Sequence, residues 1–128
     1  MDGAEDVTVF VIDWECVHLA PAHFDLGQLV GELYTLWFCK DIAAGLWIIE
    51  GIASAVEGLT EELAFRVAFH AGAHLICMTA SVPEWGGPEK LADVAREGRD
   101  IIIHAWNKDR AWFEKSRLAC LFVGESCS

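Results

Sequence analysis

Hydrophobic residues follow two different patterns along this chain. Residues 7–12 read Val-Thr-Val-Phe-Val-Ile, a β-branched and aromatic run that is typical of a strand. From residue 26 onward, apolar residues recur every three or four positions, which is the period of an amphipathic helix. The second pattern predicts helices over residues 25–39, 41–57, 60–79 and about 91–115. We therefore expect a mainly α fold with one N-terminal β-strand.

Polar residues mark the expected starts of two helices. Asp25 is followed three residues later by Gln28, which is the capping-box spacing, so Asp25 is predicted to be an N-cap. Thr60 is predicted to cap the third helix. The first turn of that helix holds Glu61 and Glu62, where the helix dipole favours negative charge.

The predicted helix over residues 41–57 is apolar nearly all round, which favours a central position in the fold. Its longest apolar stretch, residues 42–49, is too short to span a bilayer, which needs about 20 residues. Residues 81–88 carry two prolines and two glycines and predict a loop. Gly98 falls inside the last helical pattern and is expected to break or kink it.

Composition narrows the classes of function. The chain has 128 residues, of which 54% are hydrophobic, enough for the core of one domain. Its net charge of −11 argues against nucleic acid or an anionic membrane as a partner, and it would suit a cationic substrate. The five cysteines form no CxxC pair, so zinc spacing is missing. The first six residues are acidic and have no signal-peptide character, so we expect a cytoplasmic location.

Two carboxylates stand out by their positions. Asp13 follows the predicted strand directly, and Asp25 comes after Pro21, where a helix is expected to begin. Carboxylates are the hard oxygen ligands that Mg²⁺ prefers, and phosphoryl-transfer enzymes hold magnesium this way. Asp13 is therefore a candidate Mg²⁺ ligand, although aspartate is also common in turns. Glu15 is either a further ligand or a carboxylate that braces the loop.

The segment Ile12-Asp13-Trp14-Glu15, followed by Pro21 and then Asp25-Leu26-Gly27, resembles the "IDWE...P..DL" pattern of the aminoglycoside phosphotransferase and choline kinase family. This resemblance implies a helical C-terminal lobe of a protein-kinase-like fold. It implies that Asp13 binds Mg²⁺ and that Asp25 braces the catalytic loop. It also implies that the intact family member uses Mg²⁺ and ATP to phosphorylate a hydroxyl group on a small molecule, which the acidic charge suggests is cationic.

The same family normally carries an H-x-D-x-x-x-x-N catalytic loop upstream of this motif and a lysine in an N-terminal lobe. Neither is found here, where the first cationic residue is Lys40. We therefore expect residues 1–128 to be a partial C-terminal lobe with no catalytic base of its own. Alone, the chain is expected to be inactive and to bind neither cofactor.

A second hypothesis treats the chain as a non-catalytic helical interaction module derived from such a lobe. The motivation is the missing base and lysine. The run over residues 7–12 has no evident strand partner in the sequence, and another protein or a second copy of the chain would supply one.

Four histidines are further candidates. His70 and His74 have the i, i+4 spacing of a two-histidine metal clamp, but the intervening residues lack the glutamate of H-E-x-x-H, and no third ligand is evident. A partly exposed polar stripe is the stronger interpretation, and a zinc hydrolase is the weakest of the hypotheses. His18 and His23 flank Pro21, and both are candidates for the substrate side of a cleft.

Overall fold

A computed structural model describes residues 6–12, 14, 17 and 19–123. The mainly helical fold predicted from the sequence is confirmed. The α-helices in the described part are α1 (Ala22–Lys40), α2 (Ala44–Ala55), α3 (Glu61–Cys77), α4 (Pro88–Trp106) and α5 (Arg110–Glu114). Short 3₁₀ turns complete it, namely η2 (Thr79–Ser81), η3 (Pro83–Trp85) and η4 (Ala119–Phe122).

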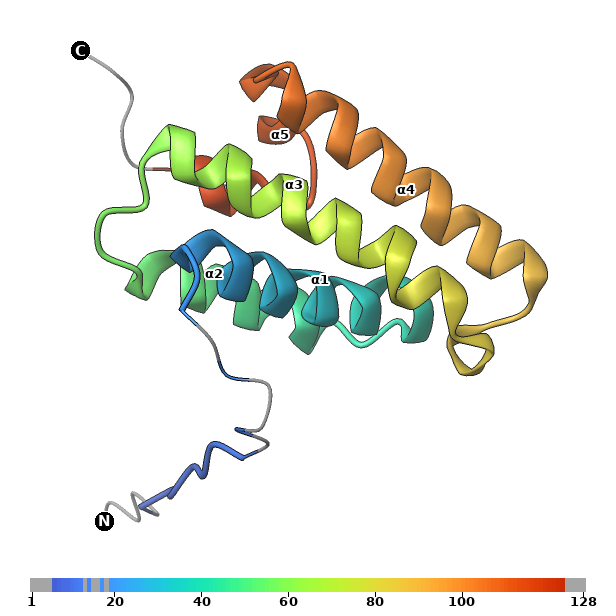
Figure 1. Cartoon of the computed structure of the whole chain (residues 1–128), viewed down its shortest axis with the longest axis horizontal. Coiled ribbons are helices and arrows are strands. Elements are labelled where there is room, and N and C mark those ends of the chain that lie inside the picture. The colour runs from blue at the N-terminus through green and yellow to red at the C-terminus, as the bar shows by residue number, and fades with distance from the viewer. Residues whose placement is uncertain (1–5, 13, 15–16, 18, 124–128) are drawn as a thin grey trace.

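Helix α3 is the central element of the bundle. It packs against α1 on one side and α4 on the other, whereas α2 packs on α1 and η4 (Figure 1). The segment Glu61–Ser81 is long and apolar enough to cross a membrane by length and composition alone. In the bundle this apolar character is accounted for by contact with α1 and α4.

The prediction that the helix over residues 41–57 would be central is therefore wrong. The observed α2 buries Ile49, but Trp47 on the same helix is 68% exposed. The central position goes to α3 because its buried faces carry small side chains, Ala64, Ala68 and Ala71 among them, which let two neighbouring helices approach closely.

Glycines sit where the helices cross most closely. A Cβ atom on Gly98 of α4 would lie 2.7 Å from the carbonyl oxygen of Gly72 in α3. A Cβ atom on Gly27 of α1 would lie 2.3 Å from the Cβ atom of His70. Helix α4 continues through Gly98, so the predicted break does not occur. Because Gly98 has no side chain, the backbones of α3 and α4 can meet at this position.

The structure confirms one predicted cap and corrects the other. Thr60 caps α3, with the Leu63 N–H donating to its Oγ1 at 3.1 Å. Asp25 is not an N-cap, because α1 begins at Ala22 and has Pro21 in the cap position. The earlier start lets the first turn of α1 contact α3, and it places Asp25 near the positive end of the helix dipole.

The helix predicted over residues 91–115 is interrupted between α4 and α5. Lys108 has φ +53°, a left-handed conformation that ends the regular helix. Asp109 then caps α5 by accepting from the Trp112 N–H at 3.2 Å, and it pairs with the Nδ1 atom of His104 at 3.0 Å. The corner turns α5 back so that Phe113 is buried against Phe65.

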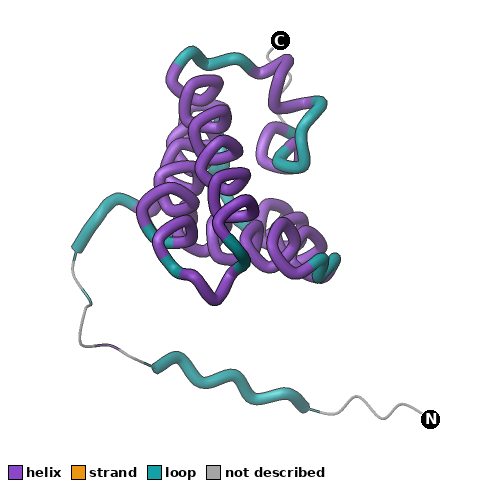
Figure 2. Tube along the Cα trace, turned by 90° about the vertical axis from the view of Figure 1, so that its right-hand side faces the viewer, coloured by secondary structure: helices purple, strands orange, loops and turns teal. Residues whose placement is uncertain are grey.

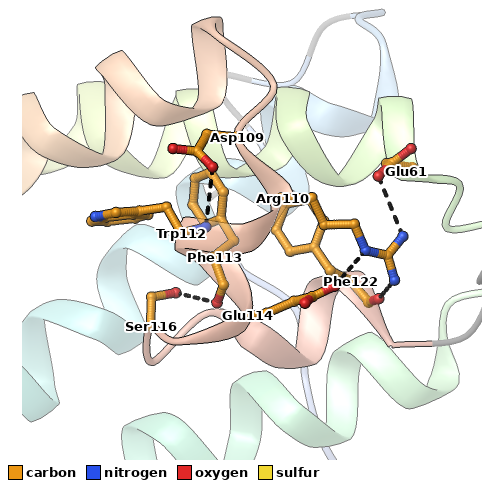
Figure 3. A network of polar contacts seen from close by, with 8 residues as sticks. All are labelled: Glu61, Asp109, Arg110, Trp112, Phe113, Glu114, Ser116 and Phe122. Atoms are coloured by element: carbon orange, nitrogen blue, oxygen red, sulfur yellow. Dashed lines mark hydrogen bonds and ion pairs between the residues drawn. The ribbon is translucent and has the colours of Figure 1, made fainter.

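The C-terminal segment closes over the first turns of α3. Phe65, Phe113 and Phe122 form a buried ring cluster. Arg110 lies at its edge and binds the carboxylates of Glu61 and Glu114 and the carbonyl oxygen of Phe122 (Figure 3). We call this region, α5 and η4 together with the start of α3, the C-terminal cap.

The strand predicted over residues 7–12 is not formed. These residues run away from the helical bundle (Figure 2), and Phe10 is 81% exposed. A strand needs a neighbour to pair its N–H and C=O groups, and the described part of the chain contains no second strand. Asp13, Glu15 and His18 lie outside the described residues.

Candidate functional site

The start of α1 meets the middle of α3 in a small cluster of rings. His70 lies 4.3 Å from Phe24 and 4.9 Å from His23, measured between ring centroids. Gly27 makes the contact possible, since any side chain there would collide with His70. Partial burial lowers the pKa of His70, and the neighbouring His23 lowers it further. The sequence candidate His23 is thus joined to a histidine from a distant part of the chain.

A shallow hollow of about 400 Å³ opens beside this cluster. Asp25 and Gln28 contribute to it from α1, and His70 and His74 contribute from α3. The structure therefore brings Asp25 of α1 together with His70 and His74 of α3, which sequence reasoning had considered only as a pair. The remaining lining residues are Phe24, Ala73, Cys77 and Met78.

His70 and His74 do not act together as a metal clamp in the described part of the chain. The Nε2 atom of His74 lies 3.1 Å from a carboxylate oxygen of Glu32, whereas the ring of His70 packs at a tilt against Phe24 at the start of α1. No group of three His, Cys, Asp or Glu side chains suited to a metal ion occurs among residues 6–12, 14, 17 and 19–123. The partly exposed polar stripe expected from the sequence fits His70, which is partly exposed, but not His74, which is only 8% exposed and packs over Gly31.

A second hollow lies between α3 and the C-terminal end of α4. We call it the α3–α4 groove. Its volume is about 380 Å³, and its apolar walls are Phe65, Phe69, Ala105 and Trp106. His70 lines both this groove and the hollow beside α1, so the two are neighbours. Sequence reasoning missed the groove because its walls come from helices that are about 40 residues apart in the chain.

The rim of the α3–α4 groove is charged. A carboxylate oxygen of Glu62 lies 2.8 Å from Nζ of Lys108, and the other lies 3.3 Å from Nε of Arg66. Hydrogen bonds from Lys108 and then from Arg66 lower the pKa of Glu62, which keeps its carboxylate ionised. Two cations and one anion leave the rim with one excess positive charge, although the whole chain carries −11.

The described residues form a mainly helical bundle with two adjoining hollows on α3. Sequence comparison places this chain in distant relationship to a phosphotransferase. That relative is phosphotransferase FrzJ from Cladobotryum sp., which is 27% identical over 112 residues. The match covers 88% of this chain but only 29% of the relative's length. No family model and no solved structure matches the chain.

Proposed function

We propose that this chain is the acceptor-side helical part of an ATP-dependent phosphotransferase that transfers the γ-phosphoryl group to a hydroxyl group of a small molecule. The observation that carries the proposal is the relationship to phosphotransferase FrzJ. The motif Ile12-Asp13-Trp14-Glu15, with Pro21 and Asp25 after it, supports the same class of chemistry independently.

In the proposed reaction, the hydroxyl oxygen of the acceptor forms a bond to the γ-phosphorus, and the bond from that phosphorus to the bridging oxygen breaks, so that ADP leaves. Bound Mg²⁺ would neutralise the charge that develops on the phosphate oxygens. Asp13, with Glu15 beside it, supplies hard oxygen ligands that fit this ion. We assign no residue of this chain as the base that accepts the hydroxyl proton.

The described residues have positioning roles in the proposal. Asp25 lies in the first turn of α1 and, by the resemblance, would brace the catalytic loop of the intact enzyme. His70 lines the hollow beside α1, where the acceptor would lie, and His23 contacts the ring of His70. His18 is a further candidate on the acceptor side.

Metal binding by a phosphotransferase that contains this sequence tests the assignment of Asp13, because the chain alone is expected to bind neither Mg²⁺ nor ATP. Mn²⁺ is titrated with ATP present, and free Mn²⁺ is followed by electron paramagnetic resonance. We expect Asp13→Asn to weaken binding at least about tenfold, because one of the few carboxylate ligands is lost. The control is Asp41→Asn at the far end of α1, where a left-handed φ of +53° suits asparagine. Equal binding by wild type and Asp13→Asn would overturn the assignment.

A second measurement concerns turnover. With [γ-³²P]ATP and a panel of hydroxyl compounds, we expect no phosphoryl transfer by the chain alone, since no base is assigned to it. Robust turnover that is lost in Asp13→Ala would contradict this expectation and would place the complete site within these 128 residues.

A further inference from the structure

We propose that the α3–α4 groove binds a small aromatic molecule that carries an anionic group. The proposal concerns binding alone, and it stands whether or not the chain takes part in phosphoryl transfer. It rests on the shape of the groove, the rings that form its walls and the charge of its rim.

The size and walls of the groove suit an aromatic ligand. A volume of about 380 Å³ falls within the range of small-molecule sites. Phe69 and Trp106 pack against each other in its wall, with ring centroids 6.2 Å apart and planes tilted by 48°, and Phe65 is a buried lining residue. Trp106 is 76% exposed, so a flat ring resting on it would cover apolar surface that water now contacts.

The rim selects the charge of the ligand. Glu62 is already paired with both Lys108 and Arg66, so its negative charge is compensated and attracts a cationic ligand only weakly. Lys108 and Arg66 share the single carboxylate of Glu62, so a bound anion would balance the remaining positive charge. His70, whose pKa is lowered, adds no charge at neutral pH. An aromatic carboxylate, sulfonate or phosphate therefore fits better than an aromatic amine.

Three probes with one ring system test the proposal: 2-naphthylacetate, 2-(2-naphthyl)ethylamine and 2-(2-naphthyl)ethanol, which are anionic, cationic and neutral. Each is titrated into ¹⁵N-labelled protein, and the indole N–H signal of Trp106 is followed by NMR. We expect the acid to bind about threefold to tenfold more tightly than the amine at low salt, because the rim charges are exposed and partly screened. The difference should shrink at high salt.

Two matched variants place the site. Trp106→Leu is expected to weaken binding of 2-naphthylacetate at least about tenfold, because the ring loses its stacking partner. Trp47→Leu on α2 removes an equally exposed tryptophan far from the groove and should leave binding unchanged. Lys108→Asn removes one rim charge, keeps a residue that tolerates positive φ, and should abolish the preference for the acid.

Several results would overturn the proposal. Equal or tighter binding of the amine would reject the anionic ligand, and unchanged binding in Trp106→Leu would reject the groove. A concentration-dependent dimer that Trp106→Leu dissociates, together with no binding of 2-naphthylacetate, would show that a second copy of the chain covers Trp106. Circular dichroism of each variant confirms that the fold is retained.

Discussion

Helix α3 is held by opposite means at its two ends. Along its middle and C-terminal half, backbone meets backbone: Gly72 faces Gly98 of α4, and His70 lies over Gly27 of α1. At its N-terminal end, the C-terminal cap fills the space with the rings of Phe113 and Phe122. The crossings with α1 and α4 depend on glycines that have no side chain, whereas the C-terminal cap depends on large aromatic side chains.

The difference shows how a small bundle uses one helix for two purposes. Close crossing at glycines fixes the positions of α1 and α4, and with them His23, His70 and the walls of the α3–α4 groove. At the other end, the large rings of Phe65, Phe113 and Phe122 belong to the hydrophobic core, and their burial stabilises the cap. Adding a side chain at a glycine crossing should therefore lower the free energy of unfolding, and so should removing an aromatic ring from the cap.

The largest expected effect comes from emptying the cap. Phe113→Ala removes a ring with no solvent exposure that contacts both Phe65 and Phe122, and should lower the free energy of unfolding by about 3–5 kcal/mol. Urea denaturation followed by far-UV circular dichroism measures it. Phe10→Ala, at a ring that is 81% exposed, is the control and should change stability by less than about 0.5 kcal/mol. Similar losses in both variants would refute the account of the cap.

The next effect comes from adding one carbon at a crossing. In Gly98→Ala the new Cβ atom would lie 2.7 Å from the Gly72 carbonyl oxygen, and such overpacking costs about 1–3 kcal/mol. This exceeds the gain of about 1 kcal/mol in helix propensity, so stability should fall. Gly51→Ala in α2 has nothing within 4 Å and should instead gain about 1 kcal/mol. The same sign for both variants in urea denaturation would contradict the close-crossing argument.

A smaller effect is expected at the polar edge of the cap. Arg110→Met breaks contacts of 2.7 Å to Glu114, 3.3 Å to Glu61 and 2.6 Å to the Phe122 carbonyl oxygen, which join three elements. The melting temperature should fall by a few degrees. Arg96→Met loses only the exposed pair with Asp93 within α4, so its melting temperature should change by less than about 1 °C. If Arg96→Met lowered it as much, Arg110 would not be joining the elements of the cap.

The smallest effect is a pH dependence at the α1–α3 crossing. The pKa of His70 is lowered in the folded chain, chiefly by burial, from an ordinary value of 6.5. The unfolded state therefore binds more protons just below that value, and stability falls as pH is lowered through about 6.5 and is fully present above it. In His70→Phe the decline in free energy of unfolding between about pH 7.5 and about pH 5.5 should be smaller. Identical profiles of stability against pH for wild type and His70→Phe would show that His70 does not cause the pH dependence.

Local sequence patterns predicted the positions of the helices well, but they did not predict which helices pack against each other. The Thr60 cap was right because a threonine followed by Glu61 and Glu62 acts within one helical turn. Asp25 had an equally good local pattern, but it is not a cap because α1 begins at Ala22. In this longer helix Phe24 contacts His70 of α3, a tertiary contact that the local pattern does not show. The corner at Lys108 was missed because a positive φ at lysine has no signal in the periodicity.

The candidate site also has residues that the sequence pointed to and features that only the tertiary structure shows. Asp13 and Glu15 were picked out by their order in the sequence, and their metal role stays a prediction. His70 and His74 were noticed for their spacing, but the spacing pointed to a shared metal, whereas each contacts a different part of α1. The α3–α4 groove had no local signature, because Phe65 and Trp106 become neighbours only when α3 and α4 pack.

The sequence by itself determined that this chain is helical and where most helices lie. These properties depend on residues within a few positions of one another, so a linear pattern records them. Only the tertiary structure decided that α3 rather than α2 is central, that Gly98 is a contact and not a break, and that two hollows meet at His70. Each of these depends on which backbones approach most closely, and that is set by side chains that are small or absent on two helices at once.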